Sequence, residues 1–337
     1  MDVRSPELAL GWPTGIGSLP HDDIDAAVAF TLTSCPEIPA APSLPRRNAR
    51  EGMLGQAAWG IAGVEVREDG SLVVDPCALD PEAPVGDGSL SGEPFATLRH
   101  FLTAVAGRTE PMKLQLTGPI TLGLALQEAG APTAVAFEVA RSAVRSRAES
   151  LLTAAKATAP DAPLIVFVDE PGLVNGLSQQ SPLTSDRTVD LVSGALATLE
   201  PHAITGLHCC GPADWKVVLQ AGPDMLSLPV SAGVGRAAGA VSSFVERGGW
   251  LAWGAVPTGG PLGDSVTRLW RQLAAQWCEL VQAGCDPVLL RRQALITPAC
   301  GLATHTIAQA NAVMGLSRRL AERLHDQVAG INISVGA

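Results

Sequence analysis

The sequence predicts an α/β fold of the (β/α)8 barrel type. Three observations lead to this prediction. Short apolar segments alternate with longer Ala-rich segments, eight segments of the first kind occur, and no Gly-x-Gly-x-x-Gly turn follows the first of them. Such alternation is typical of parallel sheets covered by helices, whereas an open dinucleotide-binding sheet carries that glycine-rich turn. We therefore expect residues 1–337 to form a single barrel domain.

The expected strands are short, apolar and rich in β-branched residues. They cover 14–17, 38–42, 112–117, 164–169, 203–208, 225–229, 251–256 and 294–297. Helices are expected over 23–34, 50–60, 94–106, 132–159, 185–199, 212–221, 235–247, 264–283 and 304–328. Segment 63–76 has two alternating runs around Asp69 and Gly70, which predicts a small β-hairpin outside the barrel.

Charge and cysteine content restrict the possible partners. The chain has 33 acidic against 23 Lys and Arg residues, a net charge of −10, and no basic run, so nucleic acid is not an expected partner. No apolar segment reaches the roughly 18 residues of a membrane span, so no membrane association is expected. Seven cysteines, an odd number, favour free or metal-bound thiols in a reducing compartment. With no apolar signal segment near the N-terminus, we expect a cytoplasmic protein.

Potential metal ligands follow two of the expected strands. Residues two apart in an extended segment point the same way, so His208 and Cys210 share one side and Cys209 takes the other. Cys300 follows the last strand and can supply a third ligand. A His/Cys/Cys set is typical of a catalytic zinc site, although buried cysteines beside a core histidine would give the same pattern. Cys209 is an alternative ligand.

Further polar residues follow other strands. Asp169 and Glu170 end a buried strand, where they can hold a substrate ammonium, act as a base, or cap the next turn. Ser18 lies in a glycine-rich turn that can bind a carboxylate or simply precede a helix. The cluster Arg46, Arg47 and Arg50 can hold a negative substrate group or form ordinary surface ion pairs.

These motifs resemble those of cobalamin-independent methionine synthase. The similarity is to the catalytic C-terminal half, within the barrel superfamily that includes uroporphyrinogen decarboxylase and corrinoid-dependent thiol methyltransferases. It runs through nearly the whole chain and rests on IGSLP (16–20), LTGPITL (116–122), VDEPGL (168–173), HCCG (208–211) and TPACGL (297–302). The resemblance implies Zn²⁺ held by His208, Cys210 and Cys300, with Ser18 at the carboxylate and Asp169 at the amino group of homocysteine.

The implied activity is methyl transfer to homocysteine, which would form methionine. Two family features are absent: Pro229 lies in the stretch where the family has a glutamate after strand six, and WGAVPTG (253–259) lacks the family's histidine near strand seven. The methyl donor is therefore left open among a methylated folate, a methylcobamide, and a corrinoid or other methyl-carrier protein. The alternatives are a decarboxylase like uroporphyrinogen decarboxylase and a non-catalytic zinc- or thiol-binding barrel.

Overall fold

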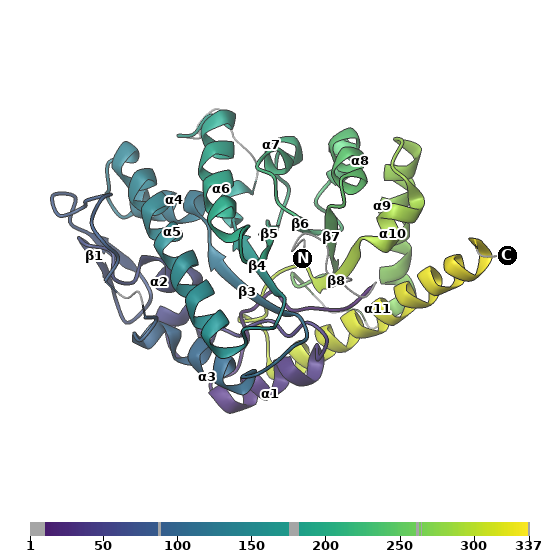
Figure 1. The fold of residues 1–337 in the computed structure, drawn as a ribbon, viewed down its shortest axis with the longest axis horizontal. Coiled ribbons are helices and arrows are strands. Elements are labelled where there is room, and N and C mark those ends of the chain that lie inside the picture. The colour runs from purple at the N-terminus through teal and green to yellow at the C-terminus, as the bar shows by residue number, and fades with distance from the viewer. Residues whose placement is uncertain (1–10, 87–88, 175–181, 261–262, 264, 336–337) are drawn as a thin grey trace.

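A curled parallel sheet forms the centre of the computed structural model, which describes residues 11–335 except 87–88, 175–181, 261–262 and 264. In this part of the chain, six consecutive strands pair in chain order, each parallel to the next (Figure 1). They are β3 (Met112–Thr117), β4 (Leu164–Asp169), β5 (Ile204–His208), β6 (Met225–Pro229), β7 (Trp250–Val256) and β8 (Ala294–Pro298). Each matches an expected strand to within one residue at either end.

Two further segments occupy the remaining barrel positions without forming regular strands. Isolated parallel bridges join Pro13 to Ile296 of β8, Ser18 to Ser43, and Ala40 to Lys113 of β3. These bridges connect β8 back to β3, so the sheet is closed as in a (β/α)8 barrel. The expectation of full strands at 14–17 and 38–42 is wrong, although both segments lie at the positions that those strands would take.

The physical reason is the composition of the two segments. Pro39 and Pro42 have no backbone N–H to donate to a ladder, and Gly17 has a φ of 143°, which other residues rarely adopt. Side chains supply part of the missing bonding. The Thr14 hydroxyl donates to the carbonyl of Ile38 at 2.8 Å, and Gln115 donates through Nε2 to the carbonyl of Ala41 at 2.7 Å.

Helices cover the outside of the barrel (Figure 1). They are α1 (Ile24–Ser34), α2 (Met53–Ala58), α3 (Ala96–Ala104), α4 (Pro119–Glu128), α5 (Thr133–Thr158), α6 (Ser185–Leu199), α7 (Trp215–Gln220), α8 (Ala238–Glu246), α9 (Val266–Gln282), α10 (Pro287–Arg292) and α11 (Ile307–Val335). Side-chain N-caps begin several of them, as where Asp23 accepts from the Ala26 N–H at 2.7 Å. Helices α4 and α10 are not among those predicted from the sequence.

Two apolar cores result from this arrangement. Ile165, Phe167, Ile204, Met225 and Leu295 belong to a small cluster inside the barrel, contributed by alternate strand positions. A much larger cluster fills the space between the sheet and the helices. Helix α11 packs on β8 and also contacts α1, so the first and last helices lie side by side (Figure 1).

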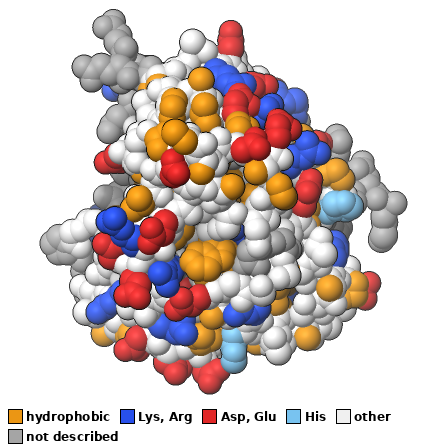
Figure 2. All heavy atoms as spheres, turned by 90° about the vertical axis from the view of Figure 1, so that its left-hand side faces the viewer, with side chains coloured by type: hydrophobic (Ala, Val, Ile, Leu, Met, Phe, Trp, Pro, Cys, Tyr) orange, Lys and Arg blue, Asp and Glu red, His pale blue; other side chains and the backbone are white. Residues whose placement is uncertain are grey.

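The expected hairpin lies beside the barrel. Strands β1 (Val64–Val66) and β2 (Leu72–Val74) pair antiparallel, and Gly70 in the turn has a φ of 81°. Helix α5 lies on the same side of the molecule, and Figure 2 shows acidic and basic side chains interspersed over this face. On α5, Arg145 pairs with Glu149 at 3.2 Å. Of the helices in the described ranges, none combines the length and the apolar character that a bilayer span requires.

Candidate active site

A cavity of about 340 Å³ opens at the ends of the barrel strands. Its lining includes several residues singled out in the sequence: Ser18, Asp169, His208, Cys210 and Cys300. They come from the first barrel segment and from the ends of β4, β5 and β8. Residues that are remote in sequence therefore meet at the C-terminal mouth, where barrel enzymes carry their active sites.

Strand register sets the relative height of these side chains. Asp169 pairs with Thr117 on one side and with His208 on the other, and His208 pairs with Ser227 of β6. Paired residues on neighbouring strands point to the same face. The layer just below the mouth of the barrel is therefore polar, whereas the layer of Phe167 beneath it is largely apolar.

Cys300 lies next to both His208 and Cys210. The Cys300 thiol is hydrogen-bonded to both the Cys210 thiol and the His208 imidazole. The bond to Cys210 raises the pKa of Cys300 to about 12, while the same bond lowers the pKa of Cys210. Cys209 is fully buried on the other side, and its Sγ lies 3.7 Å from the Gly211 carbonyl oxygen. The alternation expected for this segment is confirmed, and Cys209 is outside the cavity lining.

The side chains of His208, Cys210 and Cys300 lie close together, but they do not surround a common point. Among the described residues, no three His, Cys, Asp or Glu side chains surround a centre as metal ligands do. Their donor chemistry nevertheless fits zinc, which binds thiolate sulfur and neutral imidazole. The other ring nitrogen of His208, Nδ1, lies 2.9 Å from the Ser227 hydroxyl oxygen. A partner on Nδ1 that leaves Nε2 available is the usual arrangement for a metal-binding histidine.

Asp169 has an unused hydrogen-bonding atom at the cavity. Its Oδ1 is buried and has no hydrogen-bond partner among the described residues. Burial raises the pKa of Asp169, and the nearby Lys113 ammonium acts in the opposite direction. A buried carboxylate oxygen without a partner is costly. A ligand ammonium in the cavity would supply the missing donor.

Ser18 lines the same cavity and lies between two other segments of the mouth, since it pairs with Ser43 and bonds Leu302. Its carbonyl accepts from the Leu302 N–H at 2.8 Å, and its hydroxyl lies where a side chain at position 301 would begin. Gly301 therefore has to be a glycine for Ser18 to keep this place. The half-buried hydroxyl lines the cavity and can donate to a ligand carboxylate.

Glu170 does not face the cavity. Its side chain is fully buried, and it accepts from the N–H groups of Ile120 and Thr121 at 2.8 and 2.7 Å and from the Thr121 hydroxyl at 2.6 Å. Glu170 thus caps the N-terminus of α4, where the helix dipole favours a negative charge. Burial still raises the pKa of Glu170 to about 7. This placement departs from the expectation that Glu170 binds substrate.

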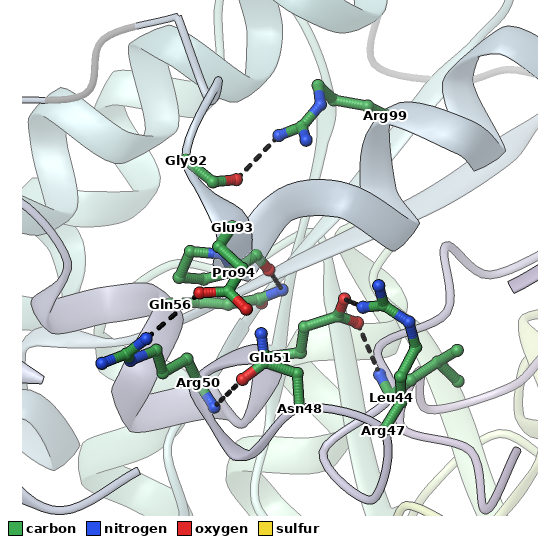
Figure 3. Close-up of polar contacts among 10 residues, drawn as sticks. All are labelled: Leu44, Arg47, Asn48, Arg50, Glu51, Gln56, Gly92, Glu93, Pro94 and Arg99. Carbon is green, nitrogen blue, oxygen red and sulfur yellow. Dashed lines mark hydrogen bonds and ion pairs between the residues drawn. The ribbon is translucent and has the colours of Figure 1, made fainter. Parts of the chain in front are cut away.

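The arginine cluster is structural. Arg47 is paired with the buried carboxylate of Glu51 at 2.8 Å, and Arg50 with Glu93 at 3.1 Å (Figure 3). Arg46 donates to the carbonyl of His305 at 3.0 Å. None of the three arginines belongs to the described cavity lining. Of the two readings of this cluster, the contacts support ordinary ion pairing.

The hydrogen bonds and ion pairs around Glu51 also stabilise one wall of the cavity. Glu51 also accepts from the Leu44 N–H at 3.0 Å, and Gln56 donates to the carbonyl of Pro94 at 2.8 Å (Figure 3). Gln56 and Met53 line the cavity. Thr117 of β3 also lines it and donates to the Met53 carbonyl at 2.8 Å. The loop after the second barrel segment is therefore fixed to both the sheet and the segment at Glu93.

A second cavity, of about 870 Å³, reaches the same thiols from another direction. It shares Cys210, Cys300, Gly301 and Thr304 with the first cavity and extends over the ends of β6 and β7 toward α9. Glu279 is the charged side chain among its described lining residues, which include no Lys, Arg or His. Pro229 also lines it.

Comparisons with known proteins establish the fold but not a family. No protein-family model matches the sequence, and no curated protein matches it. Among solved structures, a methyltransferase from Methanosarcina mazei matches 94% of this chain and 96% of its own, with a TM-score of 0.60 and 14% identity. A Cellulomonas fimi endo-beta-1,4-mannanase double mutant matches 67% of this chain and 58% of its own, with a TM-score of 0.39 and 13% identity. The chain therefore has a barrel fold like that of a methyltransferase.

Three polar residues of the site were missed in the sequence. Ser227 contacts His208, Gln115 lines the cavity, and Lys113 lies buried below it. Each is a polar residue at an inward-facing position of an otherwise apolar strand. That alternation was the available signal, because a polar side chain inside a barrel must find a partner there.

Proposed function

We propose that this protein is a zinc-dependent methyltransferase that acts on a thiol, with homocysteine as acceptor and methionine as product. The observation that carries the proposal is the joint presence of Ser18, Asp169, His208, Cys210 and Cys300 in one cavity. The likeness of the barrel to that of a methyltransferase agrees with the proposal at the level of the fold.

The acceptor end of the cavity suits an α-amino acid. The unpartnered Oδ1 of Asp169 would accept a hydrogen bond from the amino group, and the Ser18 hydroxyl would donate to the carboxylate. The amino acid's side chain would then extend toward His208, Cys210 and Cys300. Zinc held by these three residues would lower the pKa of the acceptor thiol and keep it in the nucleophilic thiolate form.

The second cavity offers the methyl donor a separate approach to the same sulfur atoms. The candidate donors are a methylated folate, a methylcobamide, and a corrinoid or other methyl-carrier protein. Because the described lining has no basic side chain, a donor with an anionic tail would find no counter-charge there. This favours a methylcobamide or a carrier protein over a folate with a polyglutamate tail.

The cavity lining also argues against a decarboxylase like uroporphyrinogen decarboxylase. A substrate with many carboxylates needs several cations, and the described lining of the first cavity contains neither Lys nor Arg. A non-catalytic thiol-binding barrel is the remaining alternative, and only a transfer assay separates it from the enzyme.

Two measurements test the proposal. Purified protein should contain close to one zinc per chain, and L-homocysteine should add a sulfur ligand that is visible by X-ray absorption spectroscopy. Incubation with homocysteine and ¹³C-methyl-labelled methylcobalamin or methyltetrahydrofolate should yield labelled methionine by mass spectrometry. Thiol binding without transfer from any donor would support the non-catalytic barrel. Absence of both zinc and thiol binding would exclude the proposal.

A further inference from the structure

Lys113 is a buried lysine directly beneath the proposed acceptor cavity. It is 2% exposed and belongs to β3, at an inward-facing position. Its Nζ donates to the carbonyl of Ile16 at 2.7 Å and to Oε1 of Gln115 at 3.2 Å. It also lies 5.0 Å from the centre of the Phe167 ring.

The strand register places the backbone of Lys113 two layers below Asp169, because Lys113 pairs with Ile165. Gln115 pairs with Phe167, and Thr117 pairs with Asp169 two residues further toward the mouth. Because Nζ contacts both Gln115 and Phe167, the side chain of Lys113 extends from the layer of Ile165 toward the mouth of the barrel. The positive charge therefore lies below a carboxylate that has an unpartnered oxygen.

A charge in this position is costly for stability. Removing an ammonium from water is unfavourable, and two neutral oxygens and an aromatic face compensate only part of this cost. An apolar residue of similar length would pack among the apolar side chains inside the barrel. Lys113 therefore calls for an explanation other than stability.

Lys113 and Gln115 also hold the irregular parts of the barrel. Lys113 binds the Ile16 carbonyl and Gln115 binds the Ala41 carbonyl. A Cβ atom at Gly17 would lie only 2.5 Å from Nε2 of Gln115, so the Gly17 backbone packs closely on this side chain. Ser18 follows directly, and its position therefore depends on the Lys113–Gln115 pair.

We propose that Lys113 is a positioning residue for the acceptor, which fixes the turn that carries Ser18 and places an ammonium group beneath Asp169. In these two ways it prepares the site for both charged ends of an α-amino acid. The proposal rests on the proposed function and deepens it. It predicts that Lys113 determines the preference for an amino-acid thiol over a plain thiol.

The test compares two thiols on zinc-loaded protein by titration calorimetry. L-Homocysteine carries the amino and carboxylate groups, whereas 2-mercaptoethanol carries neither. Lys113→Met removes the charge at similar volume, and Lys113→Gln keeps a donor for the Ile16 carbonyl. Each variant should bind homocysteine about tenfold or more weakly, as expected for loss of a charged interaction. Affinity for 2-mercaptoethanol and zinc content should stay within about twofold, since Lys113 does not contact the thiols.

Lys216→Met is the matched control, because Lys216 is exposed on α7 and should change neither affinity. An unchanged preference in the Lys113 variants would overturn the inference while leaving the proposed function intact. Equal loss of both thiols, loss of zinc, or failure of both variants to fold would show a purely structural role and would also overturn it. Wild-type protein that binds neither thiol would instead reject the proposed function.

Discussion

The imidazole Nδ1 of His208 lies 2.9 Å from the hydroxyl oxygen of Ser227 on the adjacent strand. Both residues are buried, and they pair in register between β5 and β6. When Nδ1 donates to this oxygen, Nε2 carries the lone pair that a metal requires. The sheet thus fixes the orientation of the one nitrogen ligand in the proposed set.

The three proposed ligands should each be needed for zinc. His208→Ala, Cys210→Ser and Cys300→Ser should lower bound zinc well below one per chain, because each removes one of three protein ligands. Plasma mass spectrometry of purified protein measures this directly. Cys209→Ser is the matched control, since that thiol is buried on the opposite side of the segment and should leave zinc unchanged. Near-stoichiometric zinc in all three variants would show that the ligand set is wrong.

Ser227→Ala should weaken zinc binding without abolishing it. The variant loses the partner that orients His208, and such outer contacts typically change metal affinity by about 10- to 100-fold. Competition with a chromophoric chelator measures the affinity. Ser242→Ala on α8 removes a hydroxyl that is bonded to Glu246 far from the site, so it serves as a control. Equal zinc affinity in the Ser227 variant and wild type would mean that the hydroxyl does not orient the ligand.

Asp169→Asn should affect the acceptor and not the metal. Replacing the carboxylate removes the negative charge that would bind the amino group, so homocysteine affinity should fall about tenfold or more. Zinc content should stay the same. Calorimetry with homocysteine and metal analysis of the same preparation separate the two effects. If zinc is lost instead, Asp169 belongs to the metal shell rather than to the amino-acid site.

Glu170 should make stability depend on pH. Burial raises its folded-state pKa from 4.5 to about 7 despite three hydrogen bonds. The folded protein therefore retains a proton that the unfolded chain releases between these values. The resulting stabilisation is fully present below pH 4.5 and is lost as pH rises through about 7, on the order of 3 kcal/mol.

Urea denaturation of wild type and Glu170→Gln at several pH values between 4.5 and 8 checks this prediction. The stability advantage of wild type should shrink as pH rises, and zinc content should be the same in both proteins. An advantage that grows with pH would show that the hydrogen bonds at the N-terminus of α4 outweigh burial and hold Glu170 as the carboxylate.

The sequence predicts a structural feature when the residues that determine it lie within the same short segment of the chain. Strands β3 to β8 were found because each is a short apolar run. Helix α4 was missed because its N-terminal cap is Glu170, which lies about fifty residues further along the chain. The first two barrel segments were misjudged because their partners include the side chains of Lys113 and Gln115 rather than a ladder.

The sequence by itself determined the alternation of strands and helices, the polar residues at the strand ends, and the opposite orientations of Cys209 and Cys210. These features depend only on local periodicity and on the geometry of an extended chain. Tertiary structure alone decided that Ser18, Asp169, His208, Cys210 and Cys300 share a cavity while Glu170 turns away to α4. Closure of the barrel brings these residues together, and the environment of each charge depends on neighbours that are distant in sequence.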